Sequence, residues 1–345
     1  MTFSFSNKSF TKLAPLETII PVRQITNIKE IIVTEALTSL NHNILSLQFI
    51  PPNRIACGCS DGSISIHSFN TNELTWKTII NYKKAHPGRV TSLCTLEGYR
   101  LLSSDEGNFI ESILNLNYDY SIKVWLITEN ELCLIKTLNE HTGSIYQIIP
   151  LNKERFASCS FDKKVLIWEN SNTYPLKATL PHNDSVTCIL QLKRKDILIA
   201  CEGWNSSCLR VWNSNDYKLI RKVNGYSVKN NTHMIELDNG NIALSNYKAP
   251  YHIVIVDGCS FQVVSMLQLE KDITNSSTLK VFNETSFLYV HEGKILQISN
   301  DEMKVLFKCE GKRFYGYNGI VLFENGKFFA IEYNKKISVF KCDGN

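Results

Sequence analysis

The sequence lacks the features of several large classes of protein. No stretch of its 345 residues approaches the roughly 18 consecutive apolar residues that a membrane-spanning helix needs. The start of the chain is interrupted by Ser, Thr, Asn and Lys and has no apolar run typical of a signal peptide. We therefore expect no membrane association and a cytoplasmic location, with the nucleus as the alternative.

Charge of one sign and paired cysteines are also scarce. Lys and Arg total 37 against 33 Asp and Glu, and no block of five or six like charges occurs, so we expect no nucleic-acid partner. The 11 cysteines are an odd number, and none forms a CxxC pair. We expect reduced thiols, no disulfide framework, no metal and no cofactor.

Catalytic motifs are absent as well. The chain has no GxxxxGK phosphate loop, no HExxH, no GxSxG elbow and no CxxC ligand pair. We therefore expect that the protein is not an enzyme.

The chain does contain many short apolar runs. Segments of four to eight residues rich in Val, Ile, Leu, Phe and Tyr alternate with clusters of Asn, Gly, Asp, Ser and Lys along the whole sequence. No long segment has the periodicity of a helix. This pattern predicts an all-β protein whose 43% hydrophobic content can fill a sizeable core.

A repeat runs through these strands. Trp125, Trp168 and Trp212 lie 43 and 44 residues apart, and each ends a strand-like run. Forward steps of 44, 42 and 42 residues from Trp212 reach Val256, Ile298 and Phe340. Backward from Trp125 the corresponding position is His67, 58 residues earlier, so this interval holds about 14 extra residues. These positions define seven units. A period of this length is typical of four-stranded units arranged around a ring.

The residues around these positions resemble the WD-repeat β-propeller family. Repeats of that family have a His before the first strand, a Ser or Thr on the second, an Asp in the next turn and a Trp ending the third. The matching residues are His141, Ser158, Asp162 and Trp168 in the third unit, His86, Ser103, Asp119 and Trp125 in the second, His182 and Trp212 in the fourth, and Asp61 in the first.

The resemblance implies a structural role for each such set. Trp, Ser, His and Asp would form a hydrogen-bonded chain that ties the loop before the first strand to the turn after the second. A hydrolase triad is the alternative for His141, Ser158 and Asp162. Because the set recurs in a second unit, the structural role is favoured.

These observations predict an all-β fold: a seven-bladed β-propeller of four-stranded antiparallel blades, closed by an N-terminal strand. Residues 1–25 are expected to be a flexible tail and residues 26–345 to form the propeller. The closing strand is expected within residues 29–37, paired with the strand that ends in residues 338–342.

Two loops are candidates for binding a partner. An insertion at residues 105–117 places Phe109, Ile110, Ile113 and Leu114 at helical spacing, which suits a short amphipathic helix offered to another protein. Packing of that segment on its own blade is the alternative. Trp204 is a bulky aromatic in a predicted loop and could anchor an interface or pack on the neighbouring loop.

The resemblance implies a non-enzymatic scaffold or adaptor that binds other proteins or peptides in a multiprotein complex. One alternative is the substrate-recognition subunit of a ubiquitin ligase. However, no F-box-like domain precedes the repeats, and Ile127, Asn170 and Ser214 stand where the family's cullin-adaptor motif has a basic residue. An enzyme or small-ligand binder that uses the central channel is the third reading.

Overall fold

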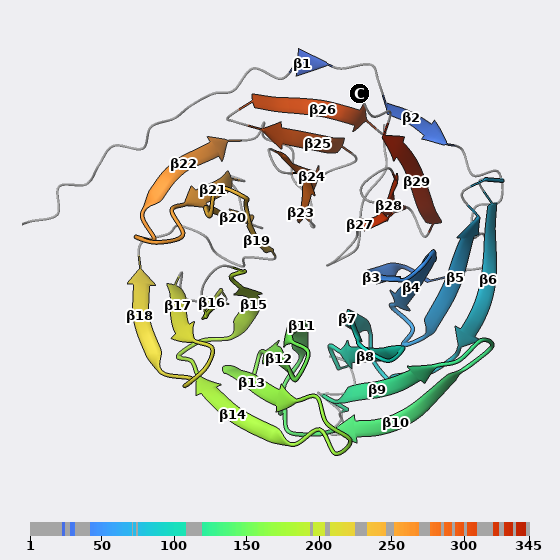
Figure 1. Cartoon of the computed structure of the whole chain (residues 1–345), viewed down its shortest axis with the longest axis horizontal. Coiled ribbons are helices and arrows are strands. Elements are labelled where there is room, and N and C mark those ends of the chain that lie inside the picture. Colours follow the sequence, from blue (N-terminus) through green and yellow to red (C-terminus); the bar gives the residue numbers. More distant parts are fainter. Residues whose placement is uncertain are drawn as a thin grey trace, which may run out of the picture.

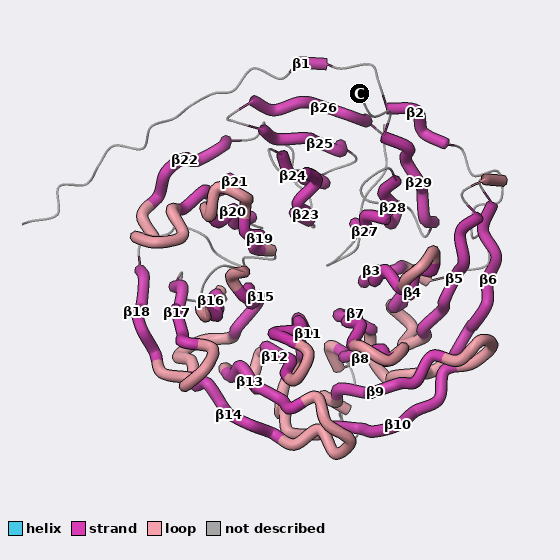
Figure 2. The backbone as a smooth tube through the Cα atoms, viewed as in Figure 1, coloured by secondary structure: helices cyan, strands magenta, loops and turns pink. Residues whose placement is uncertain are grey.

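The structure is a computed structural model of the whole chain. It describes residues 23–24, 28–31, 42–70, 72–73, 75–107, 119–193, 196–203, 208–224, 233–245, 252–268, 277–283, 286–291, 294–299, 302–308, 320–323, 328–333 and 336–342. All regular elements within these ranges are strands, and they are arranged radially around a central axis (Figures 1 and 2). The described residues contain no helix long and apolar enough to cross a membrane.

Consecutive strands form the blades, which we number in chain order. Blade 1 consists of β3 (Ile44–Ile50), β4 (Arg54–Cys59), β5 (Ile64–Asn70) and β6 (Thr75–Tyr82). Blade 2 consists of β7 (Val90–Leu96), β8 (Arg100–Asp105), β9 (Ile122–Ile127) and β10 (Leu132–Leu138). Blade 3 consists of β11 (Ile145–Asn152), β12 (Arg155–Ser160), β13 (Lys164–Glu169) and β14 (Leu176–Pro181).

The later blades follow the same order. Blade 4 consists of β15 (Val186–Gln191), β16 (Ile197–Glu202), β17 (Cys208–Asn213) and β18 (Leu219–Asn224). Blade 5 consists of β19 (Met234–Glu236), β20 (Ile242–Ser245), β21 (His252–Val256) and β22 (Val263–Gln268). Blade 6 contains β23 (Ser277–Asn283), β24 (Ser286–His291), β25 (Lys294–Ser299) and β26 (Glu302–Lys308), and blade 7 contains β27 (Ile320–Phe323), β28 (Phe328–Tyr333) and β29 (Lys336–Cys342).

The prediction of seven four-stranded antiparallel blades is wrong. Six sheets have four antiparallel strands, whereas the sheet of blade 6 has five, in the order β1-β26-β25-β24-β23. Its extra strand, β1 (Arg23–Gln24), runs parallel to β26, with Arg23 opposite Lys304 and Gln24 opposite Val305. These two residues were expected in a tail, because a two-residue strand leaves no alternation in the sequence; residues 1–22 lie outside the described part.

A second N-terminal strand completes blade 7. β2 (Ile28–Ile31) pairs antiparallel with the outer edge of β29, with Ile28 opposite Cys342 and Ile31 opposite Val339. The strand expected within residues 29–37 therefore begins one residue earlier and ends at Ile31, and residues 32–41 lie outside the described part. The beginning and the end of the propeller sequence meet in one sheet.

Packing between neighbouring blades forms the core. Second strands such as β12 and β16 are buried almost throughout, because each of their faces meets another blade, whereas the outer strand β18 is largely exposed. Five apolar clusters each join two neighbouring blades: 1 and 2, 2 and 3, 3 and 4, 4 and 5, and 5 and 6. A further cluster joins Ile44 and Cys57 of blade 1 to Val321 and Val339 of blade 7, which closes the ring.

Antiparallel strands give the ring two distinct faces. The loops that enter each first strand and the turns between second and third strands lie at one end of the blades, which we call the histidine face because His42, His86, His141 and His182 lie there. The turns between first and second strands and between third and fourth strands form the opposite face.

Candidate functional site

Blade 3 contains the complete set of four residues expected from the repeat. Trp168 Nε1 donates to Ser158 Oγ at 3.0 Å, and Ser158 Oγ lies 2.8 Å from His141 Nε2. His141 Nδ1 then lies 2.8 Å from Asp162 Oδ2. The same carboxylate accepts a hydrogen bond from the backbone N–H of Thr142, so it fixes the loop before β11 against the turn after β12.

The charge of Asp162 is maintained by these contacts. Burial alone would raise the pKa of this carboxyl, but hydrogen bonds from His141 and Thr142 outweigh burial and lower the pKa. Four buried polar side chains thus satisfy one another within an apolar blade interface. This arrangement rigidifies the histidine face and leaves the hydroxyl of Ser158 held between two rings.

Blade 2 uses a different carboxylate from the one expected. Ser103 Oγ lies 2.6 Å from His86 Nε2 and accepts from Trp125 Nε1 at 2.8 Å, as in blade 3. Asp119, expected to bind the histidine, instead pairs with Lys123 at 3.0 Å. The carboxylate that faces His86 Nδ1 is Asp105, at 3.9 Å.

Burial controls the protonation of this second pair. Burial lowers the pKa of His86 to about 3 and raises the pKa of Asp105 to about 8, with the charge of Asp119 raising the latter further. Both groups are therefore neutral near pH 7, and the separation of 3.9 Å is too long for a hydrogen bond. His86 Nδ1 therefore has no hydrogen-bond partner. Asp105 Oδ2 accepts from the backbone N–H of Gly88 at 3.3 Å, whereas its Oδ1 is also unpaired.

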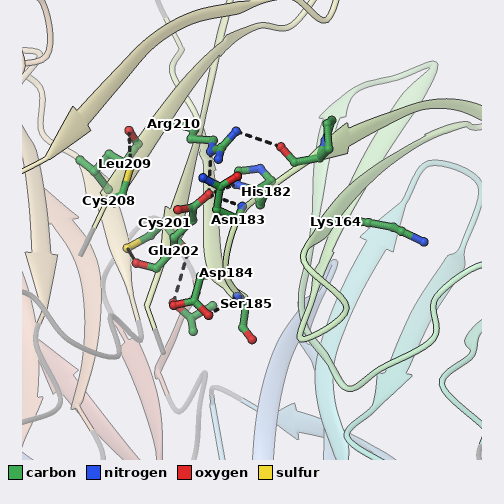
Figure 3. A network of polar contacts seen from close by, with 12 residues as sticks. Lys164, His182, Asn183, Asp184, Ser185, Cys201, Glu202, Cys208, Leu209 and Arg210 are labelled. Carbon is green, nitrogen blue, oxygen red and sulfur yellow. Dashed lines mark hydrogen bonds and ion pairs between the residues drawn. The ribbon is translucent and has the colours of Figure 1, made fainter. Parts of the chain in front are cut away.

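Blade 4 has a third version of the arrangement, shown in Figure 3. Glu202 Oε1 lies 3.2 Å from His182 Nδ1 and accepts from Arg210 Nε at 2.6 Å. The backbone N–H of Asn183 donates to the same oxygen. Although burial would raise the pKa of Glu202, hydrogen bonds from His182 and Asn183 and the charge of Arg210 lower it to about 2.

The serine position of blade 4 is occupied by alanine. Ala200 lies opposite Arg210 and Ser158 lies opposite Leu166, and both partners precede their tryptophan by two residues. Without a hydroxyl at Ala200, His182 Nε2 and Trp212 Nε1 are both buried without a hydrogen-bond partner.

The position of the carboxylate correlates with a basic residue two places before the tryptophan. Blades 2 and 4 have their acid at the end of the second strand, and Lys123 and Arg210 stand at the corresponding positions of their third strands. Both cations donate to the carbonyl just before the histidine, Lys123 to Ala85 at 2.8 Å and Arg210 to Pro181 at 3.2 Å. Only internal comparison of the repeats could have found this pairing.

Blade 1 departs furthest among the first four. His42 Nε2 lies 3.3 Å from Asp61 Oδ2, but the hydroxyl position holds Cys57 and the tryptophan position holds His67. His67 is buried and contacts the hydroxyls of Ser65 and Thr78 at 2.8 and 3.0 Å. Burial lowers its pKa to about 4, so this histidine is a neutral part of the core.

The remaining repeat positions also lie in third strands. Val256, Ile298 and Phe340 pair with Ile242, Phe287 and Phe329 of the preceding strands, as Trp168 pairs with Phe156. Asp257, after Val256, accepts hydrogen bonds from the backbone N–H groups of Cys259 and Ser260 and so closes the next turn.

The predicted partner-binding residues are not among the described residues. Phe109, Ile110, Ile113 and Leu114 fall within residues 108–118, and Trp204 falls within residues 204–207; both segments lie outside the described part. The ends of both loops are described, and they lie on the histidine face on either side of blade 3. Ser144 Oγ donates to the carbonyl of Glu106, which holds the start of the insertion against blade 3.

An exposed aromatic residue that sequence reasoning missed lies between these two loops. Phe161 occupies the turn between β12 and β13, and 44% of it is exposed. Its backbone N–H donates to Ser144, and its carbonyl accepts from Ser185 Oγ, so the turn is attached to the entrance loops of blades 3 and 4. The sequence does contain a sign of this residue: a Phe directly precedes Asp162, whereas a small polar residue, Ser60, precedes the corresponding Asp61 of blade 1.

The described residues hold no cluster of three or more His, Cys, Asp or Glu side chains suited to a metal ion. His141, Ser158 and Asp162 are fully engaged with Trp168 and a backbone N–H, so their geometry is that of a structural contact. Nine of the described cysteines form no disulfide: Cys57, Cys59, Cys94, Cys133, Cys159, Cys188, Cys201, Cys208 and Cys259.

Comparisons with known proteins agree with this geometry. The family model of the WD domain, G-beta repeat, matches residues 132–169, which include the complete set of blade 3. Residues 132–169 therefore form a WD repeat, and the chain as a whole has a β-propeller fold. A solved structure, the WD40 β-propeller domain of Doa1, is similar at a TM-score of 0.72 and 15% identity, covering 92% of this chain and 98% of that one. No curated protein sequence matches.

At that identity the structural likeness concerns the fold. Blade 3, which the family model matches, has all four residues, whereas blades 2 and 4 have altered sets. The loops on the histidine face also differ between blades in length and composition.

Proposed function

We propose that this WD-repeat propeller is a non-enzymatic scaffold or adaptor that binds partner proteins through the histidine face of blades 2 to 4. WD40 propellers commonly serve as platforms for protein interaction. The observation that carries the proposal is Phe161, a large aromatic exposed on a turn whose backbone is fixed by Ser144 and Ser185. Aromatic residues, Phe included, are enriched in the buried cores of protein interfaces.

The surroundings of Phe161 support an interface. The insertion of blade 2 begins at Glu106, whose carbonyl is held by Ser144, and the loop with Trp204 follows β16 of blade 4. Two lengthened loops therefore flank one exposed aromatic. Binding residues often lie on loops that a rigid scaffold holds in position.

Affinity purification with quantitative mass spectrometry from the native cell tests the proposal. Phe161→Ala, and a separate variant in which residues 108–117 are replaced by a short turn so that β8 stays intact, should each reduce recovery of the same partner at least tenfold. Leu176→Ala is the matched control, because Leu176 is a similarly exposed apolar residue, 41%, on the outer strand β14. Its partners should match those of the unaltered chain.

Retention of every partner by both altered chains, with unchanged melting temperatures, would overturn the assignment to this face. Loss of the same partner from Leu176→Ala would place the interface on the rim instead. We also propose a cytoplasmic or nuclear location, which microscopy of the tagged full chain tests directly.

A further inference from the structure

The outer strand of blade 5 differs from the other outer strands in its charge. β22 has the sequence VVSMLQ, without Lys, Arg, Asp, Glu or Pro, whereas β6, β10, β14 and β18 each contain at least one Lys or Arg. Charged residues on edge strands prevent unwanted pairing with other strands. No residue of β22 carries a charge that would prevent such pairing.

β22 also exposes apolar side chains at its edge. Val263 is 45% exposed and Val264 is 58% exposed. β22 is the last strand of its sheet, so its outer backbone groups pair with no strand that the structure describes. A bare edge of this kind offers both backbone hydrogen bonds and apolar contacts to another strand.

The neighbouring blade shows which segment covers such an edge. β1 already lies on the outer edge of β26 in blade 6, and it runs parallel to that strand. In Figure 1 the start of β26 lies beside the end of β22, and both outer strands run in the same direction around the rim. Because β1 is parallel to β26, its first residue, Arg23, lies opposite the half of β26 that begins at Glu302, which is the end nearer to blade 5 in Figure 1.

The length and composition of that segment suit the edge. The sequence has 22 residues before β1, which span up to about 70 Å when extended, far more than the six residues of β22 require. Residues 10–20 include Leu13, Leu16, Ile19 and Ile20 with only two charged residues. Pro15 is tolerated in a strand at the edge of a sheet.

We propose that residues 10–20 add to the outer edge of β22 as a further parallel strand, so that the N-terminal segment covers blades 5 and 6 in succession. The occupant is this chain's own segment, acting within one molecule. This interaction surface lies on the rim and is separate from the histidine face proposed for partners.

Hydrogen exchange measured by mass spectrometry tests this assignment. In a chain lacking residues 1–20, the outward amides of residues 263–268 should exchange at least tenfold faster than in the full chain. Residues 219–224 of β18 provide the internal control and should not change. A synthetic peptide of residues 7–21, added to the truncated chain, should restore the protection of residues 263–268.

A point variant separates edge pairing from general loss of the segment. Val264→Lys in the full chain should accelerate exchange in residues 10–20, whereas the matched Ile220→Lys on β18 should not. If the amides of residues 10–20 in the full chain exchange at the rate of an unstructured peptide, the proposal is wrong. Protection that disappears on dilution would also overturn it, because a second copy would then supply the strand.

Discussion

At the residue scale, one missing oxygen atom distinguishes the interior of blade 4 from that of blade 3. Ala200 occupies the serine position of blade 4, and His182 Nε2 and Trp212 Nε1 have no hydrogen-bond partner, whereas the equivalent atoms in blade 3 share the hydroxyl of Ser158. A buried polar atom without a partner loses its hydration without compensation. The two unpaired nitrogens should therefore lower the stability of blade 4 relative to a blade with a serine at this position.

Ala200→Ser should raise the free energy of unfolding by about 1 kcal/mol, because the new hydroxyl can bind both unpaired nitrogens. The reverse change, Ser158→Ala, should lower the free energy of unfolding by about 1–3 kcal/mol. Chemical denaturation of the two variants measures both effects. A destabilising Ala200→Ser would show that the site does not have the geometry of blade 3.

The pair His86 and Asp105 makes stability depend on pH. Because the pKa of Asp105 is raised from 3.8 to about 8, the folded protein holds a proton that the unfolded chain releases above about pH 4. Stability from this group is complete below about pH 4 and is lost as the pH rises toward 8, at up to about 1.4 kcal/mol per pH unit.

His86 acts in the opposite direction, since its pKa is lowered from 6.5 to about 3. The stability that depends on a neutral His86 is complete above about pH 6.5 and declines as the pH falls toward 3. Asp105→Asn removes only the loss at high pH. The melting temperature of this variant should exceed that of the unaltered chain by more at pH 8.5 than at pH 5, because the loss grows between pH 4 and pH 8; an equal difference at both values would contradict the raised pKa.

The contacts of His141 and His86 show how far sequence reasoning reached at this scale. The resemblance to the WD-repeat family implied both hydroxyl contacts, and His and Ser are 17 residues apart in both blades. The carboxylate of blade 2 was not predictable by spacing from the tryptophan, because an insertion separates Asp105 from Asp119. In blade 2 the acid that faces the histidine is Asp105, at the end of the second strand, and Lys123 stands two residues before the tryptophan. This combination is visible only when the repeats are compared with one another.

At the element scale, neighbouring blades are fastened on the opposite face by a recurring contact. Arg100 of blade 2 donates to Tyr174 Oη of blade 3 at 3.0 Å, and Arg155 of blade 3 donates to Tyr217 Oη of blade 4 at 2.7 Å. Both tyrosines have left-handed backbone angles, with φ of 52° and 61°. At the next junction, Phe261 has the same backbone conformation, with φ of 56°.

The polar pair is replaced by an apolar pair at that junction. Ile197 stands at the arginine position and packs on the cluster that contains Phe261. Arg155→Ile should therefore lower the free energy of unfolding by about 1–2 kcal/mol, because the Tyr217 hydroxyl and the Ser214 carbonyl lose their donor. Tyr217→Phe should cost less in the Arg155→Ile background than in the unaltered chain; additive losses in the double-mutant cycle would refute the coupling.

Strand positions were predictable because apolar runs and the repeat of 43 and 44 residues are strong local signals. β1 was not, because a parallel strand of two residues is defined by its partner β26 and leaves no pattern of its own. The exposed turn at Phe161 was missed for a related reason: exposure depends on the neighbouring loops, whereas the sequence shows only an aromatic beside an aspartate.

At the scale of the whole molecule, the ring depends on contacts between the two ends of the sequence. β2 supplies the outer strand of the sheet that contains β27, β28 and β29, while the first and last blades share one apolar cluster. Hydrogen bonds between β2 and β29 and apolar packing between blades 1 and 7 hold this junction. The junction is therefore where opening of the ring would begin.

Truncation tests this closure, with residues 23–31 as the deciding segment. Removing residues 1–37 deletes β2 and its four paired positions with β29, which should lower the free energy of unfolding by roughly 2–5 kcal/mol and give heat-labile or insoluble protein. Removing residues 1–22 keeps β1 and β2 and should leave the melting temperature close to that of the full chain. Equal melting temperatures for the two truncations would mean that β2 does not hold the ring closed, because blade 7 would then be stable with three strands and the apolar cluster shared by Ile44 and Val339 would carry the junction alone.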